Sequence, residues 1–451
     1  MHLFAWACRL KSWTVFFFGY TIPRIGKEFD LLKFTKQCCI NIELKSIMVP
    51  PAQILAQLLK NRYYLKHLGK KLLLYTVVTD SMCCYRITEE DELEEVDFSE
   101  VIKLLKQNAA DYISDIDGMF QAAQYLVSPL ETPVKFIQGE YFLTQAQEQI
   151  KKDLLRGLEP AFPGTFFHLT GRPGTGKTLL LYDIAKTISR QGKTLLIHCG
   201  KLTEGQEKIN QELENLSIVS VGQVKSNALF LDEYNYILVD EVHRIQETQY
   251  WEICASVDRN GQSCIFSSDP EQILSNAERK RNIVQKITEL KPKKEFILSE
   301  KLRANRELYS FIDRMRNLNH KQDAAVRYQN IYLNYANTTG EAQALIEYYK
   351  GKGFVFINYS KPHFANSPYA CYEGDYDTHH VVGQEFDKVV MLMDDSFYYD
   401  ELGVLSGVPH PNPDFLYPNL FYQGVTRVRE VLAVIVVNAP VLFGQIARIV
   451  E

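Results

Sequence analysis

The chain has 451 residues, more than a single hydrophobic core usually serves, so we expect two or three domains. Hydrophobic residues make up 46% and charged residues 23% of the sequence, which is typical of an ordinary soluble globular protein. The formal net charge of −5 argues against a wholly basic nucleic-acid binder of the histone type, but it allows a basic groove on an acidic body.

The first part of the chain shows strand and helix patterns. Residues 13–20 are apolar and aromatic, and they lack the length and the cleavage site of a signal peptide, so we predict a buried strand or helix. Residues 28–46 predict two short strands around a polar turn, and residues 50–69, which open with prolines, predict a helix. Residues 71–79 are β-branched and apolar, which predicts another strand.

The pattern changes along the rest of the chain. The acidic run within residues 87–107 predicts a solvated loop and the start of a helix. From about residue 135, apolar segments alternate with amphipathic ones, which predicts two parallel sheets with crossover helices and a boundary near residues 275–295. No stretch of about 18 apolar residues occurs, so no membrane span is expected. The nine scattered cysteines indicate reduced thiols in a cytoplasmic protein.

Residues 171–178 (GRPGTGKT) fit the phosphate-binding motif G-x-x-x-x-G-K-[ST], between a predicted strand at 165–169 and a predicted helix at 179–189. Backbone amides in such a loop surround phosphate oxygens, and the helix N-terminus adds a favourable dipole. We expect Lys177 to reach the β- and γ-phosphates of ATP and Thr178 to bind Mg²⁺. The other residues expected to contact the nucleotide here are Gly171, Gly174, Thr175 and Gly176.

An apolar strand at residues 237–239 leads directly into two carboxylates, Asp240 and Glu241. Ligands of parallel α/β sheets bind at the carboxyl edge of the strands, where these side chains would lie. We expect Asp240 to hold Mg²⁺ and Glu241 to orient or deprotonate the attacking water. The alternative is an ordinary exposed turn, which the phosphate-binding loop upstream disfavours.

Two further segments suit the same nucleotide site. Residues 143–147 (LTQAQ) resemble a Q motif, in which a glutamine reads adenine, and Gln147 fits that position. Residues 267–272 (SSDPEQ) resemble a G-D-x-x-Q motif, with Ser268 in place of the usual glycine. Gln272 is then expected to sense the γ-phosphate.

Three later segments resemble motifs of a second nucleotide-facing domain. Residues 298–308 carry an arginine that would cross to ATP, and residues 422–427 (YQGVTR) carry an arginine finger. Residues 378–387 (THHVVGQEFD) resemble T-x-H-x-x-x-G-x-E-F-D but are one residue shorter before the glycine, which leaves the roles of the two histidines open. The residues expected to act at the nucleotide are Arg303, Arg427, Gly383 and Glu385.

In this order, the segments resemble the motifs of superfamily 1 helicases, and in particular the uncharacterised helicase domains related to the Schlafen type. The resemblance covers about residues 140–440. It implies two RecA-like P-loop domains with parallel sheets at residues 140–290 and 291–451, preceded by a linker helix at 111–139. ATP and Mg²⁺ would bind between these domains, and closing and opening of the cleft would move them along a strand of nucleic acid.

The N-terminal region, residues 1–110, carries a second constellation. Asp30 would end one strand, and Glu43 and Lys45 lie two residues apart on the next, so the latter two share a face. A carboxylate pair can bind Mg²⁺ or Mn²⁺, and a lysine can activate water or stabilise phosphate charge. With Gln57 on the following helix, the pattern resembles PD-(D/E)xK nucleases and implies a small α/β nuclease domain.

Such nucleases often carry an acidic residue on a helix before the first strand, but residues 1–27 contain none, which leaves room for a truncated N-terminus. The alternative is a surface ion pair on a half-exposed strand. A nuclease fused to a compact helicase resembles the single-chain nuclease–helicase proteins of bacterial anti-phage immunity. That resemblance implies an ATP-dependent DNA helicase or translocase that degrades foreign DNA.

Two other hypotheses stay open. The front domain would be a catalytically inactive nuclease that binds DNA, or the ATPase would be a nucleotide-dependent switch rather than a motor. The expected partner is DNA, single-stranded or with single-stranded ends, and RNA is also allowed.

Overall fold

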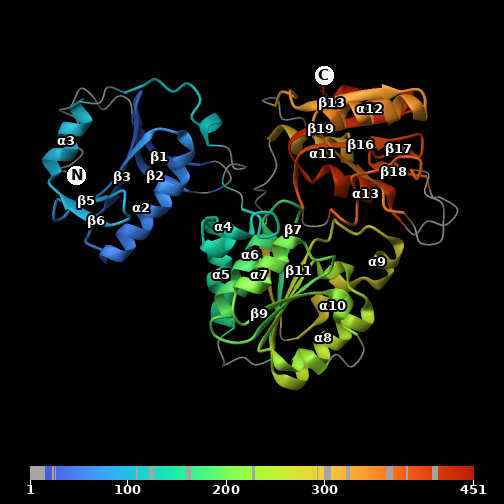
Figure 1. Cartoon of the computed structure of the whole chain (residues 1–451), viewed down its shortest axis with the longest axis horizontal. Helices are drawn as coiled ribbons and strands as arrows, with labels where there is room; N and C mark the ends of the chain where they lie inside the picture. The colour runs from blue at the N-terminus through green and yellow to red at the C-terminus, as the bar shows by residue number, and fades with distance from the viewer. Residues whose placement is uncertain are drawn as a thin grey trace. The chain divides into compact units, whose positions relative to one another are not determined.

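A computed structural model (Figure 1) gives the fold of the chain. It describes residues 16–22, 25, 27–107, 110–120, 125, 127–158, 164–225, 229–291, 293–298, 306–320, 326–361, 369–381, 384–408 and 415–450. The chain divides into two compact units. The N-terminal unit comprises residues 1–126 and 141–146, and the C-terminal unit comprises residues 127–140 and 147–451.

The N-terminal unit contains one six-stranded sheet with a helix on each face. The strands lie in the order β1-β2-β3-β4-β5-β6, and only β3 and β4 pair in parallel, because α2 connects them as a crossover. Ile54 and Leu58 of α2 pack on one face, and Val101 and Leu105 of α3 pack on the other. The elements are β1 (Phe17–Thr21), β2 (Glu28–Phe34), β3 (Cys38–Lys45), α2 (Pro51–Leu65), η1 (Lys66–Leu68), β4 (Lys71–Val78), β5 (Cys83–Ile87), β6 (Leu93–Val96), α3 (Phe98–Gln107) and η2 (Asp117–Met119).

Most of the elements predicted for this region are confirmed, with two corrections. Residues 17–20 of the segment predicted as buried lie in the edge strand β1, in which Phe18 is 55% exposed, and residues 13–15 lie outside the described residues. The acidic run is not wholly a loop and helix start, because β6 forms within it and pairs with β5.

The predicted linker helix at residues 111–139 is not observed. Among the residues described there, helical structure is present in η2, at Tyr125 and in the short α4 (Pro133–Gln138). Pro129 and Pro133 disfavour a continuous helix because proline lacks the backbone donor that a helix interior requires. Phe120 packs in the core of the N-terminal unit instead.

The C-terminal unit has two lobes, each with a parallel sheet, so the predicted α/β fold is confirmed. The first sheet has the strand order β12-β7-β11-β10-β8-β9, and every pair in it is parallel. Its elements are α5 (Gln145–Gly157), β7 (Phe166–Gly171), α6 (Lys177–Ile188), β8 (Thr194–His198), α7 (Glu204–Glu212), β9 (Leu216–Ser220), η4 (Val221–Gln223), η5 (Leu229–Glu233), β10 (Tyr236–Asp240), η6 (Val242–Arg244), α8 (Glu247–Asn260), β11 (Ser263–Ser268), α9 (Asn276–Arg281), α10 (Ile283–Glu289) and β12 (Lys293–Leu298).

The second lobe contains a parallel sheet in the order β13-β19-β16-β14-β15 and a separate hairpin of β17 and β18. Strands β16 and β19 are fully apolar along much of their length, as a sheet buried on both faces requires. The elements are α11 (Arg306–Arg316), β13 (Ile331–Ala336), α12 (Thr339–Gly351), β14 (Val355–Asn358), β15 (Tyr376–Asp377), β16 (Phe386–Met393), β17 (Phe397–Tyr399), β18 (Leu405–Gly407), α13 (Tyr417–Val425), β19 (Val428–Val437) and α14 (Pro440–Val450).

The boundary between the lobes differs from the predicted one at residues 290 and 291. Strand β12 pairs with β7 of the first sheet, so the first lobe extends at least to Leu298. Leu308 and Phe311 of α11 already lie in the core of the second lobe. The charged stretch that suggested the boundary instead forms α9 and α10, and Ile283 and Ile287 of α10 pack in the core of the first lobe. No helix among the residues described combines the length and the apolar character needed to cross a membrane.

Candidate ATP site

The phosphate-binding loop connects β7 to α6 at the carboxyl edge of the first sheet. Gly174 and Gly176 have φ angles of 76° and 81°, in the left-handed region that glycine adopts without strain. Gly171 packs so closely on β12 that a Cβ atom there would lie 2.7 Å from the carbonyl oxygen of Leu298. The backbone conformation and packing of the loop therefore require these glycines, independently of any contact with a nucleotide.

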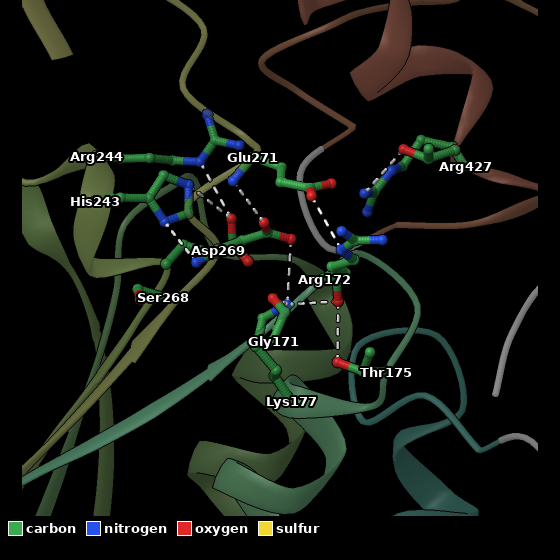
Figure 2. A network of polar contacts seen from close by, with 12 residues as sticks. Gly171, Arg172, Thr175, Lys177, His243, Arg244, Ser268, Asp269, Glu271 and Arg427 are labelled. Carbon is green, nitrogen blue, oxygen red and sulfur yellow. Dashed lines mark hydrogen bonds and ion pairs between the residues drawn. The ribbon is translucent and has the colours of Figure 1, made fainter. Parts of the chain in front are cut away.

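Lys177 begins α6 and is 6% exposed. Its ammonium group donates to the carbonyl oxygens of Gly171 (2.7 Å) and Arg172 (2.9 Å) and lies 3.3 Å from Oδ2 of Asp269 (Figure 2). The hydroxyl of Thr175 donates to the same Arg172 carbonyl at 2.9 Å. The ammonium is thus surrounded by acceptors inside the loop, and an incoming phosphate group would compete with them.

Gln147 lies on α5 and is buried against this loop. Its Nε2 donates to the carbonyl oxygens of Thr175 (3.4 Å) and Gly176 (3.3 Å). The structure therefore places Gln147 at the loop, while its predicted contact with adenine stays a prediction. Thr178 follows Lys177 in the first turn of α6.

Asp240 ends β10 and is almost fully buried. Its Oδ2 lies 3.7 Å from Nδ1 of His198, whereas its Oδ1 accepts no hydrogen bond from any described residue. A buried carboxylate oxygen without a donor is costly, and a cation would satisfy it. The residues described contain no group of three or more His, Cys, Asp or Glu side chains that could hold a metal ion. A divalent ion at Asp240 would therefore depend on oxygens from other groups, such as nucleotide phosphates and Thr178.

Glu241 follows with φ of 58°, a left-handed conformation that is uncommon for residues other than glycine. Its Oε2 lies 3.3 Å from Nε of Arg244 and 3.4 Å from Nε2 of His243. Burial raises the pKa of Glu241, but the charges around it outweigh this effect and lower the pKa to about 2. The groups responsible, the largest first, are His243, in the protonated form that it adopts only at acidic pH, then Arg244, Lys177 and Arg427.

His243 does not carry a positive charge at neutral pH. Burial lowers the pKa of its ring to about 3, even though Glu241 acts in the opposite direction. The lasting positive charges near Glu241 are therefore those of arginine and lysine side chains. The carboxylate of Glu241 stays ionised at pH 7.

The serine that replaces the usual glycine of the G-D-x-x-Q motif has a partner in this chain. Ser268 ends β11, is fully buried, and its Oγ lies 2.8 Å from Nε2 of His168 on β7. Nδ1 of His168 lies 3.2 Å from Oε1 of Glu295 on β12. These contacts connect three neighbouring strands, so His168 compensates for the extra hydroxyl group.

Gln272 lies in the loop that follows β11 and is 4% exposed. Its backbone N–H donates to the carbonyl oxygen of Asp269 at 3.3 Å. Its side-chain Nε2 is buried and has no hydrogen-bond partner among the residues described. A buried donor of this kind suits a ligand oxygen such as that of a phosphate.

Arg427 lies in the second lobe between α13 and β19 and is 6% exposed. Its Nε donates to the carbonyl oxygen of Gln423 at 3.2 Å, and Figure 2 shows its side chain opposite the phosphate-binding loop. Glu385 precedes β16, and its backbone N–H donates to Glu131. Two other predicted residues, Arg303 and Gly383, lie outside the described residues.

Glu271 and Arg316 also belong to this site, and no sequence pattern singled them out. Oε1 of Glu271 lies 3.0 Å from Nε of Arg172, and its Oε2 accepts a hydrogen bond from Nη1 of Arg316 at 2.8 Å. The guanidinium of Arg316 lies 4.8 Å from the centroid of the Tyr422 ring. Glu271 occupies a variable position of its motif, and the sequence gives no signal that pairs it with a residue on α11.

The two histidines of the predicted T-x-H segment line a cavity of about 760 Å³ in the second lobe. Ser360 donates to Oδ1 of Asp377 at 2.7 Å, and Nδ1 of His379 lies 2.6 Å from the same Ser360 hydroxyl. His380 pairs with the other oxygen of Asp377. The cavity is therefore polar and hydrogen-bonded along this wall.

In the N-terminal unit, Asp30 and Glu43 lie on the paired strands β2 and β3. Oδ2 of Asp30 accepts the backbone N–H of Leu44 at 2.7 Å. Lys45 lies two residues beyond Glu43 on β3, and Lys27 lies 4.0 Å from the Glu43 carboxylate. The predicted residues of β2 and β3 are thus neighbours.

The carboxylate of Glu43 is buried and already hydrogen-bonded on both oxygens. Oε1 accepts from Asn61 at 2.9 Å and from Asn41 at 3.2 Å, and Oε2 accepts from Gln57. Burial raises the pKa of Glu43. In this arrangement amide groups occupy the positions that a divalent ion would need, so Asp30 and Glu43 do not fit a metal site as they stand.

The family model of the Schlafen group 3 DNA/RNA helicase domain matches residues 165–352. This range includes the phosphate-binding loop, the Asp240–Glu241 pair and the loop of Glu271. The chain contains a helicase-like domain. No curated protein sequence matches the chain.

Several solved structures are distantly similar. A structure of DNA unwinding at forked dsDNA by two Pif1 helicases is 12% identical, with 67% of this chain and 94% of that chain covered and a TM-score of 0.37. Arterivirus nonstructural protein 10, a helicase, is 13% identical, with 63% of this chain and 62% of that chain covered and a TM-score of 0.35. AMPPCP-bound DnaA from Aquifex aeolicus is 12% identical, with 42% of this chain and 57% of that chain covered and a TM-score of 0.25.

Proposed function

We propose that this protein is an ATP-dependent helicase or translocase that acts on nucleic acid. The observation that carries the proposal is that groups of both lobes meet at the phosphate-binding loop. Glu271 of the first lobe contacts Arg172 of that loop and Arg316 of the second lobe, and Arg427 of the second lobe lies opposite the loop (Figure 2). The charge of Arg427 also contributes to the lowered pKa of Glu241. An ATPase whose site takes groups from two lobes can couple hydrolysis to movement of the lobes. A nucleotide binder with a single lobe would not need this arrangement.

The chain's own residues have distinct roles in this proposal. Lys177 leaves its carbonyl partners to bind the β- and γ-phosphates, and the buried Nε2 of Gln272 donates to the γ-phosphate. Glu241, ionised at pH 7, accepts a proton from the attacking water or orients it. Arg427 stabilises the charge that develops on the transferred phosphoryl group.

Thr178 and Asp240 would hold the Mg²⁺ that accompanies the nucleotide, and the buried Asp240 Oδ1 without a donor supports this assignment. When bound, that ion would neutralise phosphate charge.

Hydrolysis of ATP by the purified full chain, with and without single-stranded DNA or RNA, tests the proposal. We expect DNA to stimulate the rate many-fold and Lys177→Ala to abolish it. Hydrolysis that no nucleic acid stimulates would favour the alternative of a nucleotide-dependent switch. A Lys177→Ala variant that still hydrolyses ATP would remove the proposed active site.

The N-terminal unit supports two candidate functions. Metal-dependent cleavage, which an anti-phage role through degradation of DNA would require, rests on the sequence pattern of Asp30, Glu43 and Lys45 on the paired strands β2 and β3, and it would require the amide partners of Glu43 to give way to the ion. The hydrogen-bonded state of Glu43 favours the other candidate, a nuclease-like domain that binds DNA without cutting it.

A cleavage assay on labelled DNA with Mg²⁺ or Mn²⁺ separates the two. Cleavage by the wild-type chain that is lost in both Glu43→Ala and Lys45→Ala would establish the nuclease. Cleavage that survives both substitutions would refute this site, and DNA binding without cleavage would support the inactive domain.

A further inference from the structure

The loop between β11 and α9 connects the two lobes of the C-terminal unit. Leu274 is fully buried in the core of the second lobe, although the loop starts from the first sheet. Its carbonyl oxygen accepts from the backbone of Leu416 at 2.9 Å, and that of Ile273 accepts from Nδ2 of Asn419 at 2.7 Å. The loop therefore moves with the second lobe at one end and with the first sheet at the other.

The start of the same loop contacts the phosphate-binding loop. Asp269 Oδ2 lies 3.3 Å from the ammonium of Lys177, and Asp269 Oδ1 accepts the backbone N–H of Glu271 at 2.9 Å. Any phosphate group that draws Lys177 away from Asp269 acts on the segment that positions Glu271. Occupancy of the nucleotide site is thereby connected to the Glu271 backbone.

The side chain of Glu271 contacts two arginines from different lobes. One carboxylate oxygen faces Arg172 of the phosphate-binding loop at 3.0 Å, and the other faces Arg316 of α11 at 2.8 Å. The Glu271 side chain is 20% exposed, whereas those of Arg172 and Arg316 are 57% and 42% exposed, so water screens part of the attraction in each pair. The Tyr422 ring lies against the Arg316 guanidinium and fixes its position.

These contacts make the two arginines competitors for one negative charge. An incoming triphosphate offers Arg172 a stronger anionic partner, and each pair formed with Glu271 weakens the other. When Arg172 binds the phosphates instead of Glu271, the ion pair between Glu271 and Arg316 strengthens. The second lobe is then bound more tightly to the loop between β11 and α9. By linkage, that bond favours binding of the triphosphate.

We propose that Glu271 is a positioning residue that changes its main ion-pair partner from Arg172 to Arg316 when ATP binds. This change couples occupancy of the nucleotide site to closure of the lobes. The inference rests on the proposed function, because it places ATP at Lys177. Neither arginine is assigned to the chemical step.

Binding of a non-hydrolysable ATP analogue to the full chain tests the coupling without turnover. We expect Arg316→Gln to weaken binding about tenfold, within the usual range of coupling between sites. The same substitution in a Glu271→Gln background should change the affinity less than twofold. Arg316→Lys, which keeps the charge, should restore most of the affinity.

Arg314→Gln is the matched control, because Arg314 lies on the same helix but donates to the Ile449 carbonyl within the second lobe. It should leave analogue affinity unchanged. If Arg316→Gln lowers the affinity for the analogue equally in the wild-type and Glu271→Gln backgrounds, the inference is overturned. It is also overturned if Arg314→Gln and Arg316→Gln lower that affinity equally. Unchanged binding by Lys177→Ala would instead show that the nucleotide site itself is wrong, which would refute the proposed function and the inference together.

Discussion

Replacing Arg427 by Gln removes a buried positive charge that contributes to the lowered pKa of Glu241. If the guanidinium lies about 5 Å from the transferred phosphoryl group in the complex with ATP, one unit charge contributes about 3 kcal/mol at an effective dielectric constant of about 20. That energy corresponds to a rate effect of about 10² to 10³. We therefore expect kcat for ATP hydrolysis to fall at least about a hundredfold, which is less than the range of about 10³ to 10⁵ typical of arginine fingers.

The assay is steady-state hydrolysis in saturating single-stranded DNA, together with the affinity for a non-hydrolysable ATP analogue. Binding should change less than about threefold, because Arg427 acts on charge that develops during the reaction. Arg448→Gln, an exposed arginine on α14, should leave both quantities unchanged. A kcat within tenfold of the wild type would refute the assignment of Arg427, and equal losses of binding and kcat would indicate a general role in holding the nucleotide.

Two further predictions concern stability. His168→Ala should lower the free energy of unfolding of the C-terminal unit by about 1–3 kcal/mol, because the buried Ser268 hydroxyl loses its hydrogen-bond partner. Chemical denaturation measures this change, and an unchanged denaturation midpoint would contradict the prediction. Gly424→Ala should cost about 1–3 kcal/mol in the same assay, because its Cβ would lie 2.2 Å from Sδ of the buried Met391. Gly444→Ala, where no atom lies within 4 Å, is the control and should not destabilise the protein.

Local sequence was sufficient to predict features that lie within a single helix, strand or loop. Residues 171–178 can be identified because the motif is contiguous and its Gly174 and Gly176 adopt left-handed conformations that other residues rarely take, and the strand before Asp240 and Glu241 is apolar enough to identify. The same holds for β2, β3 and α2 of the N-terminal unit.

Predictions that required neighbours in space were less successful. The lobe boundary was wrong because β12 is charged in sequence, yet it belongs to the first sheet through its pairing with β7. The motif position of Glu43 predicted a metal ligand, and that role stays a prediction; the sequence did not show that Asn61 and Gln57 of α2 donate hydrogen bonds to the Glu43 carboxylate. These contacts depend on how α2 packs across the sheet that contains β3, which local sequence does not specify.

The sequence by itself determined the α/β class, the phosphate-binding loop and the carboxylate pair, because period and local backbone preference are properties of short segments. Tertiary structure decided that His168 supports Ser268, that the charge of Arg427 contributes to the lowered pKa of Glu241, and that Glu271 lies between two arginines. These relations join residues that are distant in the chain. Their strength depends on burial and separation, which only the folded arrangement fixes.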